Sequence, residues 1–542
     1  MIYYILLSLQ KREDGIVNTT MIVIAIVLYL GFMVAIGFYY SNKNKNIGDF
    51  YLGGRKLGPL VTAMSAEASD MSAYLLMGIP GLALMCGLAE AAWTAIGLAV
   101  GTYINWLIVS KRLRKYSERI DATTIPEFFS KRFGDKHHIL SLISAIIIIV
   151  FFIPYTASGF SACGKLFGSL FGMDYTLAMV ISAAVIILYC TLGGFLAAST
   201  TDLIQSIIMT IALFVVVGFS EGLIGGFDNV FANVHSLNGF TNLFQGFDVA
   251  SATTGSFDGF KIVSTLAWGL GYFGMPHILL RFMAIDNPNK LKTSRRIASV
   301  WVVISMGLAI LVGVVGLSLM QQGIIGPYES SSAAETVIVD ISSFLATRGY
   351  IPAFIGGVFV SGILASTMST ADSQLIAASS SVTQDILVDT CKIKLSDKKQ
   401  MVIARLSVIV ISVIAIFLAR DPNGSVFRIV SFAWAGFGAA FGPVMLFGLF
   451  WKRTTKGGAL AGMIVGGAMV FIWKYLIAPK GGVLAVYELL PAFLCGCIAI
   501  VVVSLITKKP GEEITSVFDE IKADIKNKRA RKTEVATNAV TE

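Results

Sequence analysis

Residues 65–78 read SAEASDMSAYLLMG and lie inside an apolar run that is long enough to cross a bilayer. The stretch carries two acids, Glu67 and Asp70, and small residues where a spanning helix would have leucine or isoleucine. An unpaired aspartate at the centre of a spanning helix costs about 2.5–3.5 kcal/mol on insertion scales, whereas small residues let other helices and unwound backbone approach closely. The stretch therefore indicates a cation or substrate site within the membrane. The alternative is a carboxylate satisfied by neighbouring backbone or by a basic partner.

The composition indicates a polytopic membrane protein. Of the 542 residues, 55% are hydrophobic and only 14% are charged, which is the balance of a chain that crosses lipid many times. The apolar runs of spanning length lie at about 20–40, 58–85, 88–110, 139–163, 176–200, 203–225, 261–284, 299–321, 351–378, 400–419, 426–450, 456–477 and 483–507. Lipid tolerates only helices or closed barrels. We therefore expect an all-α fold of about 13 transmembrane helices.

The composition also disfavours several classes of function. The six cysteines and four histidines show no spacing typical of a disulfide framework or a zinc site. The sequence has no nucleophile with a nearby base and no nucleotide-binding loop, so we do not expect an enzyme. A net charge of +9 would suggest a nucleic-acid partner for a soluble protein, but in a membrane protein the basic residues indicate topology. We expect no nucleic-acid partner.

The distribution of Lys and Arg orients the expected spans, because basic residues near span ends stay in the cytoplasm. The first, third, seventh, ninth and eleventh connections and the C-terminal tail hold nearly all of these residues. Eight of them lie between residues 111 and 136, and five more lie between Arg281 and Arg296. The bias alternates along the whole chain. It predicts an N-terminus outside and a C-terminus in the cytoplasm.

We divide the chain into three parts. Residues 1–20 are an N-terminal extension, disordered or upstream of an effective start near Met21. Residues 21–507 form the transmembrane domain, with core repeats at about 58–225 and 261–450. Residues 508–542 are a cytoplasmic tail, which begins as an amphipathic helix and ends as a charged, disordered segment.

The seventh apolar run predicts a second interrupted helix. Its helix-weakening residues are Gly269, Gly271, Gly274 and Pro276. Proline has no N–H to donate and glycine gains entropy on leaving a helix, so the backbone ladder should open here. Trp268, Tyr272 and Phe273 would then line the cavity. The alternative is a simple kink for packing.

The ninth run is rich in hydroxyls that share one helical face, namely Ser366, Ser369, Thr370 and Ser373. A hydroxyl stripe that faces a carboxylate and freed carbonyls suits Na⁺, a hard cation that prefers oxygen ligands. Alternatively, the hydroxyls bond to carbonyls of their own helix or join helices together. Asp372 adds a second intramembrane acid. No partner for this acid is evident in the sequence.

The two interrupted spans, the second and the seventh, lie five spans apart. An inverted five-plus-five repeat gives this offset and places its sites near the midplane, where unwound segments meet. The arrangement predicts a transporter.

Several long motifs resemble the sodium:solute symporter family, and within it most closely the bacterial sodium/proline branch. They are YLGGRKLGP (51–59), SAEASDMSAYLLMGIPG (65–81), FFIPYTASG (151–159), WGLGYFGMPH (268–277), ILASTMSTADSQL (363–375) and AWAGFGAAFGP (433–443). The likeness runs from about residue 21 to 510. It implies a leucine-transporter-type fold with one extra helix before the inverted repeat and two after it, in a bacterial cell membrane.

The resemblance also implies roles for particular residues. The sodium ligands would be the carbonyls of Ala68 and Met71 and the hydroxyls of Ser366, Ser369 and Thr370. The residues linked to proline binding would be Tyr155, Trp268, Tyr272 and Pro276. The residues linked to coupling would be Asp70, Ser72 and Arg55. Asp202 matches an acid that in some relatives helps to bind a second sodium. Apart from the resemblance, Asp372, Ser373 and Glu67 are further candidates for a second sodium or another ion.

The sequence departs from the family pattern at three positions. Proline symporters usually have glycine where this chain has Glu67 and Ala73, and they lack an acid at Asp372. Glu67 has three interpretations: it pairs with a basic group, it binds a proton or ion, or it faces the outer vestibule. Ala73 adds a methyl group that could narrow the solute pocket.

We therefore expect sodium-coupled uptake of L-proline by alternating access, with one chain sufficient in the bilayer. One alternative is symport of another amino acid, a compatible solute or a monocarboxylate. The other is a channel or a nutrient sensor that binds its ligand without concentrating it.

Overall fold

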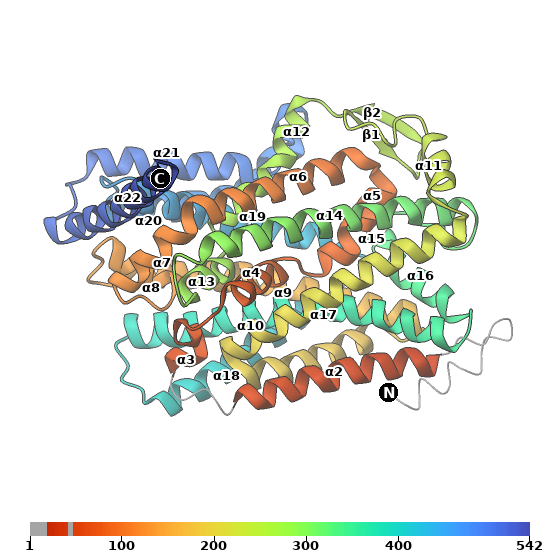
Figure 1. Cartoon of the computed structure of the whole chain (residues 1–542), viewed down its shortest axis with the longest axis horizontal. Coiled ribbons are helices and arrows are strands. Elements are labelled where there is room, and N and C mark those ends of the chain that lie inside the picture. The colour runs from red at the N-terminus through yellow and green to blue at the C-terminus, as the bar shows by residue number, and fades with distance from the viewer. Residues whose placement is uncertain (1–18, 42–46, 542) are drawn as a thin grey trace.

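The computed structural model describes residues 19–41 and 47–541, and most of these residues are helical. The long helices lie side by side along the longest axis of the molecule (Figure 1). One end of this bundle carries the hairpin of β1 (Gln245–Asp248) and β2 (Thr253–Ser256), which we call the hairpin end. The opposite end carries α22 (Glu512–Thr541), which we call the tail end.

The remaining helices, with η for 3₁₀ or π helices, are α2 (Thr19–Ser41), α3 (Ile47–Leu52), η1 (Gly53–Arg55), α4 (Pro59–Asp70), η2 (Tyr74–Gly78), α5 (Ile79–Cys86), α6 (Leu88–Ile104), η3 (Asn105–Val109), α7 (Ser110–Arg119), α8 (Ile125–Arg132), α9 (Ile139–Phe171), α10 (Tyr175–Ile224), α11 (Phe227–His235), α12 (Gly259–Leu266), η4 (Ala267–Phe273), α13 (Pro276–Ala284), α14 (Leu291–Gln321), α15 (Ser331–Ala334), α16 (Val337–Ala346), α17 (Tyr350–Ser380), η5 (Ser381–Thr390), α18 (Asp397–Leu418), α19 (Val426–Phe450), α20 (Lys456–Ile472), η6 (Trp473–Ile477), η7 (Ala478–Lys480), η8 (Gly482–Leu484) and α21 (Leu489–Ile506).

The expected count of thirteen spans is not confirmed. In the described chain, ten helices are long and apolar enough to cross a membrane, or eleven if the bent pair Pro59–Asp70 and Tyr74–Cys86 is one span. The two expected spans not in this count are the fifth and the seventh. Within α10, an apolar piece of only Tyr175–Leu188 precedes a non-helical Gly194 with φ 70°. The seventh run divides into α12, η4 and α13, each too short to span.

The seventh run is broken as predicted, and its middle part packs unusually closely on a neighbour. A Cβ on Gly101 of α6 would lie 2.4 Å from the Cα of Gly269 in η4. A Cβ on Gly271 would lie 1.9 Å from Nε1 of Trp434 in α19. Glycine is therefore required here by close packing as well as by the loss of helix.

The two helices with the predicted hydroxyls and acids, α4 and α17, lie at the centre of the bundle. Every residue of α4 from Thr62 to Asp70 is buried, as is every residue of α17 from Phe359 to Ser380. By contrast, α18 is only 28% buried in its apolar window. A helix that is buried on all faces is enclosed by other helices, so polar groups on α4 and α17 do not face lipid.

The tail begins as the predicted amphipathic helix. Phe518 and Ile521 of α22 are buried. The helix continues to Thr541, where the sequence predicted a disordered end. The predicted extension of residues 1–20 lies almost wholly outside the described residues.

Candidate sodium and solute site

The second span breaks within the stretch that the sequence singled out. Helix α4 ends at Asp70, and the chain bends by 60° before η2 and α5 continue it. Met71 has left helical geometry, with φ −75° and ψ 72°. The amide of Ser72 donates to the Asp70 carbonyl at 2.8 Å, and the amide of Leu75 donates to the Ser72 carbonyl at 3.0 Å. In an unbroken helix these two amides would bond to the carbonyls of Ala68 and Met71, so the break frees both predicted sodium ligands from the ladder.

The hydroxyls of α17 meet this freed backbone. The Ser369 hydroxyl donates to the Ala68 carbonyl at 2.8 Å, across 301 positions of sequence. The Thr370 hydroxyl is buried and has no hydrogen-bond partner among the described residues. The Ser366 hydroxyl donates to the Ile363 carbonyl at 2.8 Å. This bond to a carbonyl of the same helix is the alternative that the sequence analysis gave for these hydroxyls. We call Ala68, Met71, Ser366, Ser369 and Thr370 the hydroxyl cluster.

The hydroxyl cluster has the chemistry of a sodium site. All the atoms in it that could coordinate a cation are neutral oxygens, and hard cations prefer oxygen ligands. The buried Thr370 hydroxyl has no hydrogen-bond partner among the described residues, and an unsatisfied buried polar group is costly. These residues therefore fit Na⁺.

Asp70 lies against two of the predicted solute-binding residues. The Tyr272 hydroxyl donates to Oδ2 of Asp70 at 2.6 Å. The Tyr155 hydroxyl donates to the Asp70 carbonyl at 3.2 Å. The other carboxylate oxygen of Asp70 has no hydrogen-bond partner in the described chain. Ser72, at the break itself, accepts from the amide of Tyr74 at 3.4 Å.

Trp268 is the aromatic wall of a cavity that extends towards the hairpin end. Its ring lies 5.3 Å from that of Tyr487 and 5.2 Å from that of Phe427. Trp434 donates to the Trp268 carbonyl at 2.8 Å. The cavity has a volume of about 320 Å³, and its polar lining includes Ser431 and Glu335. Pro276 is the first residue of α13, directly after the break in the seventh run.

Arg55 lies apart from these residues, at the tail end. Its guanidinium donates to the carbonyls of Met283 and Ala122 at 2.8 and 2.7 Å. It also donates to the hydroxyl and the carbonyl of Ser117, each at 3.2 Å. Arg55 therefore joins the beginning of the second span to the end of the seventh and to the connection after α7.

Three of the four predicted second-ion residues come together around a side chain that the sequence analysis placed elsewhere. The sequence analysis counted Arg281 among the basic residues of a cytoplasmic connection. In the structure Arg281 lies on α13 and its side chain is only 1% exposed. Its guanidinium lies 3.2 Å from Oδ2 of Asp202 and donates to the hydroxyls of Ser65 and Ser373. Ser65 donates to Asp202 at 2.6 Å, and Ser373 donates to Asp372 at 3.1 Å. We call Ser65, Asp202, Arg281, Asp372 and Ser373 the arginine cluster. The positive charge in this cluster is the guanidinium of Arg281.

Glu67 belongs to neither cluster. It is 1% exposed, so its carboxylate does not face solvent in this structure. One carboxylate oxygen accepts from Nε1 of Trp106 at 2.9 Å, and the other has no hydrogen-bond partner among the described residues. The ring of Trp106 lies 4.4 Å from that of Phe282. Ala73 is completely buried at the break.

Sequence reasoning missed three residues that build the site. Arg281 was detectable, because the apolar residues 282–285 follow it before the polar connection begins. Trp434 lies in a motif that was noted, but its bond to the Trp268 carbonyl spans 166 positions. Asn105 donates to the Tyr272 carbonyl at 3.0 Å and so holds the break in the seventh run. Contacts between residues so far apart in the sequence cannot be predicted from the spacing of motifs.

A profile of the sodium:solute symporter family matches residues 50–466. The chain belongs to the sodium:solute symporter family. It is therefore a transporter and not an enzyme, as the sequence predicted.

Several family members resemble the chain over almost its whole length. It is 41% identical over 509 residues to the osmoregulated proline transporter of Bacillus subtilis, covering 94% of this chain and 99% of that one. It is 42% identical over 515 residues to the sodium/proline symporter of Haemophilus influenzae, covering 92% and 97%. A solved Na⁺-coupled sialic acid symporter, substrate-bound and outward-open, superposes with a TM-score of 0.74 at 19% identity, covering 91% and 99%. The last likeness confirms the expected fold class.

Proposed function

We propose that this protein takes up L-proline together with Na⁺ by alternating access. The observation that carries the proposal is the 2.8 Å hydrogen bond from Ser369 to the Ala68 carbonyl at the break in the second span. It supports a sodium site formed by α17 and the freed backbone of residues 68–72. Relatives about 40% identical to this chain are named as proline transporters, which supports proline as the solute.

Sodium at the hydroxyl cluster would act on the solute site through one short piece of backbone. Ala68 and Met71 are its proposed ligands, and Asp70 lies between them. Asp70 in turn accepts hydrogen bonds from Tyr155 and Tyr272. A cation that fixes residues 68–71 against α17 would also fix Asp70 and both tyrosines. Each ligand would then favour binding of the other, as linkage requires.

The solute pocket we propose lies between Asp70 and Trp268, with Pro276 at the N-terminus of the next half-helix. Proline has an apolar ring, which suits the aromatic walls of Trp268 and Tyr272. Its carboxylate and secondary ammonium each need a polar partner. The N-terminal end of α13 suits the carboxylate, and the free oxygen of Asp70 suits the ammonium.

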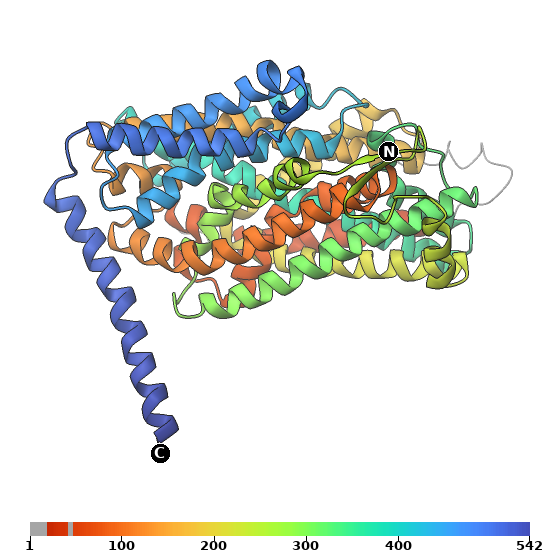
Figure 2. The ribbon, with the colours of Figure 1, turned by 90° about the horizontal axis from the view of Figure 1, so that it is seen from above.

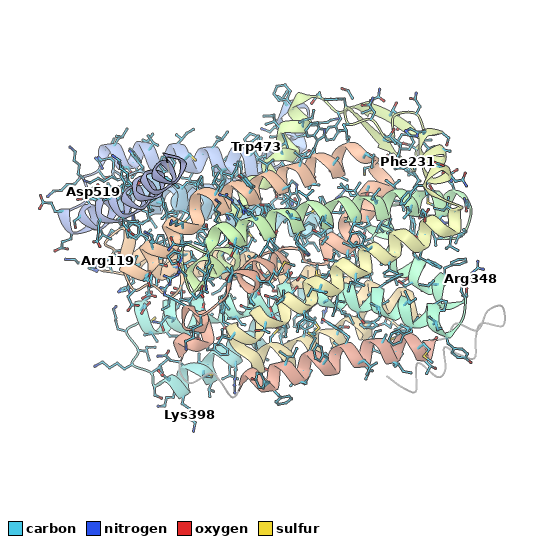
Figure 3. All side chains as sticks on the ribbon, viewed as in Figure 1. Arg119, Phe231, Arg348, Lys398, Trp473 and Asp519 are labelled. Carbon is cyan, nitrogen blue, oxygen red and sulfur yellow. The ribbon has the colours of Figure 1, made fainter. Side chains whose placement is uncertain are left out.

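We propose that the tail end faces the cytoplasm of a bacterial cell and that the hairpin end faces outside. Figure 3 shows Arg119 and Lys398 at the tail end, where the positive-inside rule expects basic residues. In this orientation the inside-negative potential contributes about 2.3 kcal/mol per charge per 100 mV to inward movement of Na⁺. A single chain contains every residue of the proposed site, so we expect a monomer to suffice.

Uptake of radiolabelled L-proline into proteoliposomes, with and without an inward sodium gradient, tests this function. We expect sodium-driven accumulation by the native protein and its loss in Asp70→Asn. Sodium-driven uptake of another solute but not of proline would overturn the substrate. Binding of proline without accumulation would favour the sensor or channel.

A further inference from the structure

The C-terminal helix α22 has an unusual position for a soluble tail. It begins at Glu512, and five residues separate it from the end of α21 at Ile506. Five residues span at most about 17 Å, so the start of α22 lies close to the membrane surface. Figure 2 shows α22 crossing the direction of the long helices and passing beyond the outline of the bundle. Its far end leans back along the long axis of the bundle.

The first half of α22 is docked on the bundle. Phe518 and Ile521 are buried, and the Arg132 guanidinium lies 5.2 Å from the Phe518 ring. Glu520 pairs with Arg119 of α7 at 2.9 Å. Asp524 pairs with Lys115 of α7, and Asp519 pairs with Lys452 in the connection after α19. Figure 3 shows Arg119 and Asp519 at the tail end.

The charge of α22 changes sign where this docking ends. Residues 512–524 hold five acids and one base, and the acids include the three that pair with the bundle. Residues 526–532 read KNKRARK, with five bases in seven positions and no acid. The bases are Lys526, Lys528, Arg529, Arg531 and Lys532. The part of the helix that projects from the bundle is therefore strongly basic.

We propose that residues 526–532 of α22 bind anionic phospholipid headgroups. Basic clusters next to a spanning helix are attracted to anionic lipid at short range. The headgroups are also the polyanion nearest to this segment, because the docked half fixes α22 beside the membrane. A nucleic acid or an acidic protein would match the charge but not this fixed position. The proposal rests on the membrane embedding of the chain and not on its solute.

Hydrogen exchange of the full chain in nanodiscs tests the proposal. We compare discs of phosphatidylcholine alone with discs that contain phosphatidylglycerol. We expect amides of residues 526–541 to exchange at least about tenfold more slowly in the anionic discs, and expect added salt to remove this protection. Nanodiscs expose both membrane faces, so the result does not depend on the proposed orientation.

A variant with Lys526→Gln, Lys528→Gln, Arg529→Gln, Arg531→Gln and Lys532→Gln should lose the protection. Neutralising Lys392, Lys394, Lys398 and Lys399, exposed bases after η5 and in the first turn of α18, should leave it intact. Sodium-driven uptake in neutral liposomes should be unchanged in the tail variant, which separates this proposal from the proposed function. Equal exchange in both kinds of disc would overturn the proposal. Protection that appears in neutral discs only at high protein concentration would also overturn the proposal, because it would indicate that this segment binds a second copy of the chain.

Discussion

The hydroxyl cluster and the arginine cluster join the same two helices, α4 and α17, at neighbouring levels. At one level Ala68 and Ser369 meet, and no basic side chain of the described residues pairs with the oxygens around them. At the other level Ser65 and Ser373 both contact Arg281, which pairs with Asp202. Ser65 precedes Ala68 by three residues, and Ser373 follows Ser369 by four, so the two levels are about one helical turn apart.

The difference lies in where the positive charge comes from. In the arginine cluster it is covalently attached to α13, so it cannot leave and forms a permanent connection between four helices. In the hydroxyl cluster it must come from solution, so it can arrive on one side of the membrane and leave on the other. The same pair of helices thus contains a fixed ionic contact and, as we propose, an exchangeable one.

The largest expected effect comes from breaking the fixed contact. Arg281→Met leaves Asp202 buried without its cation, and loss of one partner of a buried pair costs about 3–5 kcal/mol. We expect a correspondingly lower free energy of unfolding and a lower melting temperature in detergent. The double variant with Asp202→Asn should recover part of the loss. Additive losses in the double variant would contradict the pairing.

Removing sodium should weaken the exchangeable contact. A ligand that binds only the folded protein stabilises it by about 2.7 kcal/mol at one hundred times its Kd. Replacement of Na⁺ by choline should therefore lower the melting temperature of the native protein. Thr370→Val keeps the shape but loses the hydroxyl, and its melting temperature should depend much less on Na⁺. An undiminished sodium effect in this variant would place sodium elsewhere.

The connection from the hydroxyl cluster to the solute pocket is tested by Tyr272→Phe. Its hydroxyl donates to the Asp70 carboxylate, and such charge-assisted bonds contribute about 1.5–3 kcal/mol. We expect a loss of about tenfold or more in kcat/KM for proline uptake. Tyr328→Phe is the matched control, because Tyr328 donates to the Asp340 carboxylate at 2.7 Å, distant from the site. Similar losses in both variants would argue for a general effect on stability.

The smallest effect is expected for Glu67→Gln. Glutamine keeps an oxygen to accept from Trp106 and removes the negative charge. Because the Glu67 side chain bonds to Trp106 and makes no hydrogen bond to either cluster, we expect sodium-driven uptake within about twofold of the native rate. A loss comparable with that of Asp70→Asn would instead make Glu67 part of the ion site.

The sequence predicted what local chemistry determines. The charges and small residues around Asp70 indicated the break in the second span, and the glycines before Pro276 indicated the one in the seventh. Hydroxyls at helical spacing placed Ser366, Ser369 and Thr370 on one face. The expected span count was not confirmed. Gly194 divides the fifth run in a way that composition does not show, and the seventh run, whose break was predicted, contains no helix long enough to span.

The arginine cluster shows what spacing could not supply. The proximity of Arg281 to the end of an apolar run led us to assign it to a connection, yet it lies in the core. Its partners Ser65, Asp202 and Ser373 are 216, 79 and 92 positions away. Only the packing of α4, α10, α13 and α17 brings them together, and hydrophobic periodicity does not encode which helices meet.

One pair of variants tests the central claim most directly, because Ser369 and Ser373 lie one turn apart on α17 and belong to different clusters. The measurement is the Na⁺ concentration that gives half-maximal proline uptake. We predict that Ser369→Ala raises it about tenfold, the loss of roughly 1.4 kcal/mol of sodium binding, and that Ser373→Ala leaves it unchanged. An increase in Ser373→Ala equal to that in Ser369→Ala, or no change in Ser369→Ala, would contradict the account.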